Sequence, residues 1–460
     1  MEVDKKSITE LGSRPIRQLL MQYAIPAIIA MTASSLYNMI DSIFIGQGVG
    51  ALAISGLALT FPLMNLAAAF GSLVGMGAST LISLRFGQRD YGEAQNILGN
   101  VVVLNTIIGA SFGIICLTFL NPILYFFGAS EFTIGYARDY MQIILAGNLV
   151  SHMFLGLNAI LRASGHPRRS MAATINAVVI NAILDPIFIY GFDWGIRGAA
   201  IATILAQIIS LSWQIYIFSD KRELLHFKRG IYKLRSKIVK NIFVIGMPSF
   251  FMNLAACLIV IFINKGLKQY GGDLNVGAYG IVNRIAFIFV MIVMGLNQGM
   301  QPIAGYNYGA QQYDRVKRVL KLTLIGATVV TTVGFVVGVF FPSIAVSAFT
   351  TDRQLISLAV TGMRITLLAF PVVGVQMVVS SFFQSIGMAK HAIFLSLSRQ
   401  LIFLLPCLLL LPVIFTKYTT FDGSWGVWCS MPFSDVITTI IALFMLRKQL
   451  NIFNRKMVNK

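Results

Sequence analysis

The sequence predicts an all-α integral membrane protein with twelve transmembrane helices arranged in two six-helix lobes. Three observations indicate this fold: an apolar composition, a series of apolar stretches, and a repeat that relates the two halves of the chain. Of the 460 residues, 57% are hydrophobic and 12% are charged, and the mean hydropathy is +0.77. A soluble domain of this size does not bury so much apolar surface, so the chain belongs in a lipid bilayer.

Twelve apolar stretches account for most of the chain. A helix needs roughly 20 apolar residues to cross a hydrocarbon core of about 30 Å. The predicted helices cover residues 19–45, 53–84, 95–120, 132–161, 169–190, 196–219, 239–267, 276–306, 317–342, 354–386, 391–415 and 425–447. The segments between them are short, which leaves no room for a separate soluble domain.

The second half of the chain repeats the first at a spacing of 222 residues. The clearest matched pairs are Pro26 with Pro248, Gly77 with Gly299, Tyr91 with Tyr313 and Gly165 with Gly387. Six crossings in each repeat is an even number, so both repeats enter the membrane from the same side. We therefore expect a pseudo-two-fold axis along the membrane normal. Pro26 is expected to kink the first helix.

The basic residues predict the orientation. Most of the 36 Lys and Arg residues lie in the two tails and in the loops after even-numbered helices, which is the positive-inside pattern. Both termini are then cytoplasmic. We expect an N-lobe of residues 1–219, a basic cytoplasmic linker of residues 220–238 and a C-lobe of residues 239–460. This pattern explains the net charge of +19 without a nucleic-acid partner.

One repeated cytoplasmic turn has recognisable helix-end signals. Gly87 is expected to end the second helix in a left-handed conformation, and Asp90 and Glu93 favour the start of the next helix. The segment 308–314 repeats this arrangement in the second half.

Three of the 17 acidic residues, Asp41, Asp185 and Asp435, fall deep inside predicted helices. A charged group at that depth costs roughly 2.5 to 3.5 kcal/mol, so it normally faces a cavity or a partner. Asp185 follows Asn181 by four residues, which places both side chains on one helix face. Thr203 on the next helix, and Tyr37 beside Asp41 on the first, extend this set of polar groups.

Two chemistries fit this set, and the residues alone do not rank them. Carboxylate, amide and hydroxyl oxygens are hard ligands suited to a small cation such as Na⁺. Burial and a neighbouring like charge also favour a protonated carboxyl group, so the same acids can carry H⁺. A third interpretation is a purely structural hydrogen-bonded pair. The second repeat argues against it, because the matching positions are Ile263, Phe403, Cys407 and Met431.

The second half carries arginines in or near its predicted helices instead. Arg284, Arg364 and Arg399 lie in or near predicted helices, together with Asp435. Either Arg284 or Arg399 pairs with Asp435 or with helix-end carbonyls, or one of them gates the cavity or orients a substrate. The four cysteines and four histidines show no metal-binding or catalytic spacing, and the loops lack the clustered acids and histidines that a membrane enzyme would need.

At several of these motifs the chain resembles the multidrug and toxic compound extrusion (MATE) transporters. The resemblance covers nearly the full length and is carried by the segment 37–46, the turn Phe86-Gly87, and the segments 162–167 and 181–186. It implies two lobes that open as a V and exchange an organic cation for H⁺ or Na⁺, without any other cofactor.

The resemblance also implies residue roles. In similar proteins the cation network of the N-lobe falls on the positions of Asp41, Tyr140, Asn181, Asp185 and Thr203. Positions that line or approach the drug cavity match Met31, Tyr37 and Asn158. Some relatives use acids on the seventh and tenth helices. This chain has Asn253 and Ala255 on the seventh, so coupling through the C-lobe is not expected.

The resulting hypothesis is a multidrug efflux antiporter of the cell (inner) membrane. We expect small amphipathic or cationic substrates, contact with membrane lipids, no nucleic acid, no catalytic activity and a monomeric state. The alternative is a lipid-linked sugar or polysaccharide flippase of the same superfamily, which is expected to have a strongly cationic cavity and often extra helices.

Overall fold

The computed structural model describes residues 2–458, except for the side chains of residues 2–7, 38, 39 and 51, and it contains helices but no strand within that range. The first half consists of α1 (Glu2–Ser13), α2 (Ile16–Gly48), α3 (Ala51–Gly87), α4 (Tyr91–Thr118), α5 (Leu120–Phe126), α6 (Ile134–Ala146), α7 (Asn148–Ala163), α8 (Pro167–Pro186), the π-helix η1 (Ile187–Gly191) and α9 (Gly195–Ser219). The second half consists of α10 (Ser236–Gly309), α11 (Tyr313–Phe340), α12 (Pro342–Ser347), α13 (Arg353–Leu367), α14 (Phe370–Ser385), α15 (Ala389–Leu397), the π-helix η2 (Ser398–Leu404), α16 (Leu405–Tyr418) and α17 (Gly423–Val458).

These helices form the twelve predicted spans. In the described part of the chain, nine helical stretches are long and apolar enough to cross a membrane, and two bent pairs, α6 with α7 and α13 with α14, add two spans. The bends are 55° and 52°. The twelfth span comes from α10, which is interrupted at Gly272 (φ 73°), so its 74 residues are two helices. The chain is therefore a multi-pass membrane protein.

Two terminal helices differ from the prediction. The charged segment before the first span forms α1, which the sequence analysis did not predict. The last helix, α17, continues to Val458, eleven residues beyond the predicted end at residue 447. Its C-terminal extension stays packed, because Phe453 is fully buried against the helices of the second half.

The expected left-handed end at Gly87 is wrong. Gly87 is helical, and the positive φ falls on Arg89 (60°) and, at the matching position of the second repeat, on Gln311 (56°). The glycine is needed at this position for a close helix contact instead. A Cβ on Gly87 would lie 2.0 Å from the carbonyl oxygen of Tyr306. The expected capping is confirmed, since the Asp90 side chain accepts a hydrogen bond from the Glu93 amide at 2.9 Å.

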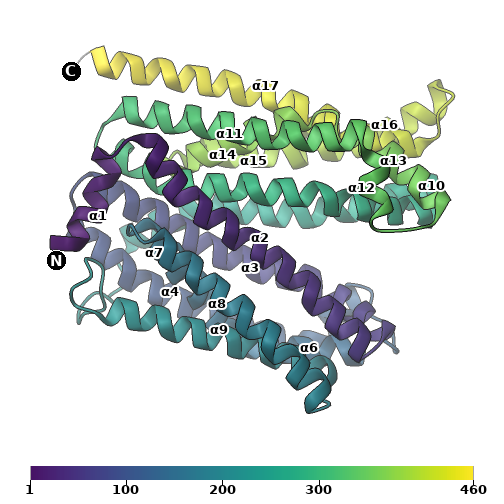
Figure 1. Ribbon diagram of the computed structural model, residues 1–460, viewed down its shortest axis with the longest axis horizontal. Coiled ribbons are helices and arrows are strands. Elements are labelled where there is room, and N and C mark those ends of the chain that lie inside the picture. Colours follow the sequence, from purple (N-terminus) through teal and green to yellow (C-terminus); the bar gives the residue numbers. More distant parts are fainter. Residues whose placement is uncertain (1, 459–460) are drawn as a thin grey trace.

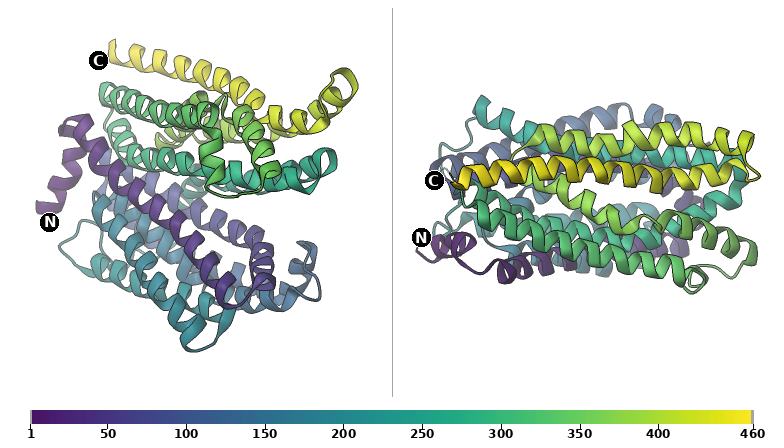
Figure 2. Two further views of the ribbon diagram at one scale, coloured as in Figure 1. Left: turned by 45° about the vertical axis from the view of Figure 1, so that its right-hand side comes forward. Right: turned by 90° about the horizontal axis from the view of Figure 1, so that it is seen from above.

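The two halves of the chain lie side by side, the first in purple to teal and the second in green to yellow (Figure 1). Both termini lie at the same end of the molecule, which we call the termini end. The helices of the two halves approach each other there and diverge toward the opposite end (Figure 2). The contact between the halves is made mainly by α10 with α3 and α2.

Glycines allow this contact. A Cβ on Gly77 of α3 would lie 2.0 Å from the carbonyl oxygen of Ile242, and one on Gly246 of α10 would lie 1.8 Å from that of Leu73. The repeat places the same arrangement on the other side: Cβ atoms on Gly299 and Gly295 would lie 2.6 Å from the Cα atoms of Ala24 and Ile28. We call these four glycines the glycine closure. Without side chains, the backbones of the two halves touch directly.

Candidate functional site

The predicted acid cluster forms between α2, α8 and α9 in the first half. The side chains of Asp41 and Asp185 are buried, with 5% and 0% of their surface exposed, and their carboxyl groups interact directly. Asn181 donates from Nδ2 to Oδ1 of Asp185 at 3.2 Å, as its spacing of four residues predicts. Two buried carboxyl groups this close to each other favour a shared proton or a cation between them.

Three residues with hydroxyl groups line one side of the cluster. Asn181 also donates to Oγ1 of Thr203 at 3.3 Å, and the hydroxyl of Tyr37 lies 2.9 Å from the same oxygen. Thr203 in turn donates to the carbonyl oxygen of Ala199 at 3.1 Å. Tyr140 is buried and lies beside Thr203. The structure therefore brings together the five residues expected in the cation network, with Tyr37 beside them.

The cluster has an excess of hydrogen-bond acceptors. Among the described residues, Oδ1 of Asp41, Oδ2 of Asp185 and Oδ1 of Asn181 are buried and accept no hydrogen bond. A buried acceptor without a donor is costly, and three of them in one cluster favour a bound cation or added protons. In the part of the chain that the structure describes, this cluster included, no three His, Cys, Asp or Glu side chains gather in a metal-binding group.

The backbone beside the cluster is irregular. Pro186 directly follows Asp185 and supplies no N–H, and the π-helix η1 begins at the next residue. A single π-turn inside a membrane helix is typical of functional sites, because it re-aims side chains without ending the helix. In the second half, the π-helix η2 contains Arg399.

The other residues predicted for the first half lie elsewhere. Met31 is at the contact between the halves, where Nε2 of Gln298 lies 3.3 Å from its sulfur. Asn158 is held between α7 and α8, since its Nδ2 donates to Thr174 at 2.8 Å and its Oδ1 accepts from Ser170. Pro26 lies inside the continuous helix α2. Their predicted roles in the cavity and the kink stay predictions.

The second half carries an ion pair in place of the acid pair. Nε of Arg399 donates to Oδ1 of Asp435 at 2.7 Å, and Ser434 donates to the carbonyl oxygen of Arg399 at 2.8 Å. The pair joins η2 to α17, one helical turn closer to the termini end than the positions that match Asn181 and Thr203. The pair neutralises the charge of Asp435, the one acid of this half that the sequence analysis placed deep inside a helix.

Arg284 does not pair with Asp435. Its side chain is exposed on α10, on the helix face opposite the buried Val293, which lies nine residues further along. Gly295, eleven residues further, is on nearly the same helix face as Arg284, and it contacts α2. Arg284 is therefore on the face of α10 that turns toward the first half.

The Arg399–Asp435 pair predicts a stability effect. Arg399→Gln is expected to lower the melting temperature of the purified protein, because it leaves the carboxylate of Asp435 buried without its charge partner. The double variant Arg399→Gln/Asp435→Asn is expected to recover part of this loss. Recovery in a double-mutant cycle of melting temperatures supports a structural pair, and additive losses would contradict it.

Sequence reasoning missed a set of contacts between the halves. Gln301 donates from Nε2 to Oγ1 of Thr80 at 2.6 Å, and both side chains are buried. The glycine closure was also missed as an interface. Its sequence signal was present, because Gly77 and Gly299 are one of the matched pairs of the repeat.

Comparisons with known proteins agree with this geometry. The MatE family model matches residues 26–187 and again residues 248–409, which reproduces the spacing of 222 residues. The Multidrug export protein MepA of Staphylococcus haemolyticus is 28% identical over 431 residues, 94% of this chain and 93% of the relative. The protein of the same name from Staphylococcus aureus strain MSSA476 is 25% identical, over 96% of this chain and 97% of the relative.

A solved structure shares the fold. It is described as the outward-facing conformation of a multidrug resistance MATE family transporter of the MOP superfamily. The TM-score is 0.90 at 24% identity, over 97% of this chain and 98% of that chain. Since the family model matches both halves and covers most of the sequence, the chain belongs to the MatE family of membrane transporters.

Proposed function

We propose that this protein is a secondary active antiporter that exports amphipathic, cationic organic compounds in exchange for H⁺ or Na⁺. The coupling ion binds at Asp41, Asn181, Asp185 and Thr203, with Tyr140 and Tyr37 at its edge. The observation that carries the proposal is the group of three buried acceptor oxygens without donors in this cluster. The names of the relatives, which are multidrug export proteins, support the cargo.

The arrangement supports alternating access. The halves are closed at the termini end by the glycine closure, and Asp41 lies thirteen residues beyond the contact at Ile28, about 20 Å along α2. Ion binding in the first half then favours cargo release to the open side. By linkage, cargo and ion weaken each other's binding by the same factor.

The orientation follows from the charges. We place the protein in the cell (inner) membrane with the termini end in the cytoplasm, because the basic residues concentrate there. The N-lobe is residues 1–219 and the C-lobe residues 239–460, with the linker between them. The protein acts as a monomer, and lipids surround it.

The arginines of the C-lobe have different roles. Arg399 and Asp435 form a structural pair. Arg284, exposed on the face of α10 that turns toward the first half, orients the cargo. Arg284→Gln is expected to change the KM for cargo while the dependence on the ion gradient stays as in the wild type, which transport assays with several cargoes would measure. An unchanged KM for every cargo contradicts this role.

The cargo is tested with purified protein in liposomes under an imposed ion gradient. A lipophilic cation such as tetraphenylphosphonium is expected to accumulate against its own gradient. A fluorescent lipid-linked oligosaccharide is the probe for the alternative flippase activity. Movement of the oligosaccharide, without accumulation of the cation under either an H⁺ or a Na⁺ gradient, contradicts the proposal.

A further inference from the structure

The segments that lead into the two repeats cross the termini end. The N-terminal strap (residues 8–14) precedes α2, and the linker strap (residues 223–235) precedes α10. At the repeat spacing of 222 residues, Leu11 of the first strap matches Lys233 of the second. The N-terminal strap leads into the first half but is bound by the second half. The linker strap leads into the second half but is bound by the first half.

The N-terminal strap is bound by the second half. Ile8 and Leu11 are buried, with 1% and 0% of their surface exposed. Asn307 at the end of α10 donates from Nδ2 to the carbonyl oxygen of Leu11 at 2.9 Å. Arg315 at the start of α11 donates from Nη2 to the carbonyl oxygens of Leu11 at 3.0 Å and of Arg14 at 2.7 Å. Apolar and polar contacts thus act together.

These bonds cap a helix end. The last carbonyls of a helix have no donor within the helix, and a cation at that end interacts favourably with the helix dipole. Arg315 supplies the donor and the charge, and its Nε donates to Oδ1 of Asn307 at 2.8 Å, which fixes both side chains. The second half therefore recognises the C-terminal end of α1.

The linker strap is bound in the same manner by the first half. Asn100 of α4 donates from Nδ2 to the carbonyl oxygen of Lys233 at 3.1 Å and accepts at Oδ1 from the amide of Arg235 at 2.9 Å. Gln95, one turn earlier, bonds with the backbone N–H and carbonyl of His226. Asparagine side chains therefore hold the matching carbonyls of both straps.

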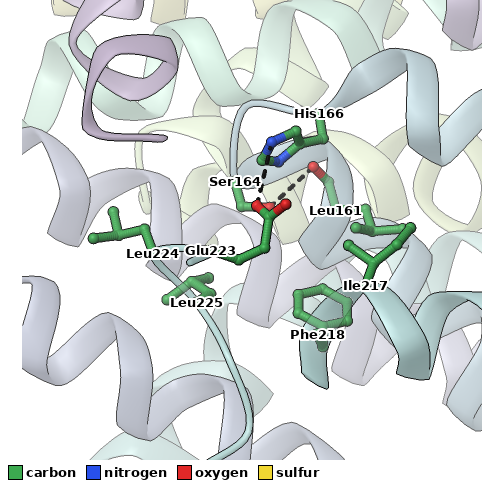
Figure 3. A pocket seen from close by; sticks show the side chains of 8 residues that line it. All are labelled: Leu161, Ser164, His166, Ile217, Phe218, Glu223, Leu224 and Leu225. Atoms are coloured by element: carbon green, nitrogen blue, oxygen red, sulfur yellow. Dashed lines mark hydrogen bonds and ion pairs between the residues drawn. The ribbon is translucent and has the colours of Figure 1, made fainter. Parts of the chain in front are cut away.

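The start of the linker strap is anchored to α8 and the turn before it. The carboxylate of Glu223 pairs with Arg169 and lies 3.5 Å from Nε2 of His166. Figure 3 shows the His166 ring beside this carboxylate, in a small pocket whose wall includes Leu224 and Leu225. Since this strap also follows α9 directly, it stays with the first half when the halves move apart.

The N-terminal strap is different, because its covalent connection is to α2 while its hydrogen bonds are to the second half. It also lies beside the contact between the halves: Gly12 faces the ring of Tyr306, whose carbonyl contacts Gly87 of α3. If the halves part at this end, the bonds from Asn307 and Arg315 to the strap must break.

We propose that the N-terminal strap is a latch that holds the termini end closed, and that its release from Asn307 and Arg315 precedes opening on that side. The inference rests on the proposed alternating access and adds a control element to it. Any change that detaches the strap shifts the protein toward the state that is open at the termini end.

Hydrogen exchange of the full-length protein in lipid nanodiscs tests the latch without transport. Arg315→Gln is expected to raise exchange about tenfold in peptides from residues 73–87 and 295–309, and to leave the distant residues 36–48 unchanged or slower. Arg318→Gln removes the same charge from an exposed position one turn along α11 and is expected to match the wild type. Ile8→Asp detaches the strap from its other side and is expected to reproduce Arg315→Gln.

Three results overturn the latch: exchange in Arg315→Gln and Ile8→Asp that equals the wild type, an equal rise in Arg318→Gln, or a uniform rise over the whole chain. If the latch variants behave as expected and the wild type transports no cation, the latch stands and the export proposal fails. If the wild type exports the cation and both latch variants exchange like the wild type, the export proposal stands and the latch fails.

Discussion

Replacing Gly77 by alanine is expected to abolish export while the protein stays folded. The new Cβ would lie 2.0 Å from the carbonyl oxygen of Ile242 and 3.1 Å from the amide nitrogen of Gly246, both backbone atoms of α10. Backbone atoms do not move aside as a flexible side chain does, so the halves would have to separate by at least an ångström. The packing within each half is expected to stay intact. The substitution therefore removes the state that is closed at the termini end from the transport cycle.

Gly75→Ala is the matched control for this variant. It lies in the same helix, two residues away, and its Cβ would meet the Cβ of Ala159 at 3.5 Å, an ordinary contact. Gly299→Ala, at the matching position of the second repeat, is expected to behave like Gly77→Ala. Gradient-driven export and melting temperature are measured for all three. Export by Gly77→Ala equal to that of Gly75→Ala contradicts the role of the glycine closure.

Replacing Asp185 by asparagine is expected to lower ion-driven export by about tenfold or more. The amide has nearly the size of the carboxyl group, but it carries no negative charge and binds no proton at physiological pH. It therefore cannot balance the charge of a coupling ion, and ion exchange at the cluster is weakened. Asp41→Asn removes the other half of the pair and is expected to have the same effect. Binding of cargo in the absence of a gradient is expected to persist in both variants.

Asp139→Asn is the control for the acid variants. Asp139 is in the same half and precedes Tyr140, but its carboxylate forms a solvent-exposed pair with Arg197 at 2.9 Å. Exposed pairs contribute little to stability. Export by this variant is expected to equal that of the wild type, which separates loss of an acid at the cluster from loss of an acid in general.

The spans and the acid cluster were predictable because their signals are strong in an apolar chain. A carboxylate is rare inside a membrane helix, so Asp41 and Asp185 were conspicuous, and the four-residue spacing placed Asn181 beside Asp185. The repeat then located the asymmetry between the halves. Tyr140 was reached through the family resemblance, since a single buried tyrosine inside a helix has no distinctive pattern of its own.

The contacts between the halves were less predictable, because they depend on which helix faces meet. Sequence spacing left Arg284 and Arg399 as equal candidates to pair with Asp435. The structure shows that Arg399 lies on the helix next to Asp435 and Arg284 does not. The strap was missed because α1 is short and charged, although Ile8 and Leu11 are spaced to share one face.

The most direct test of ion coupling at the acid cluster is cargo transport by purified protein in liposomes, with H⁺ and Na⁺ gradients imposed separately. The wild type is expected to accumulate a lipophilic cation under at least one gradient. Asp41→Asn and Asp185→Asn are expected to lose that accumulation, and Asp139→Asn is expected to keep it. Undiminished gradient-driven accumulation in both acid variants would contradict coupling through Asp41 and Asp185.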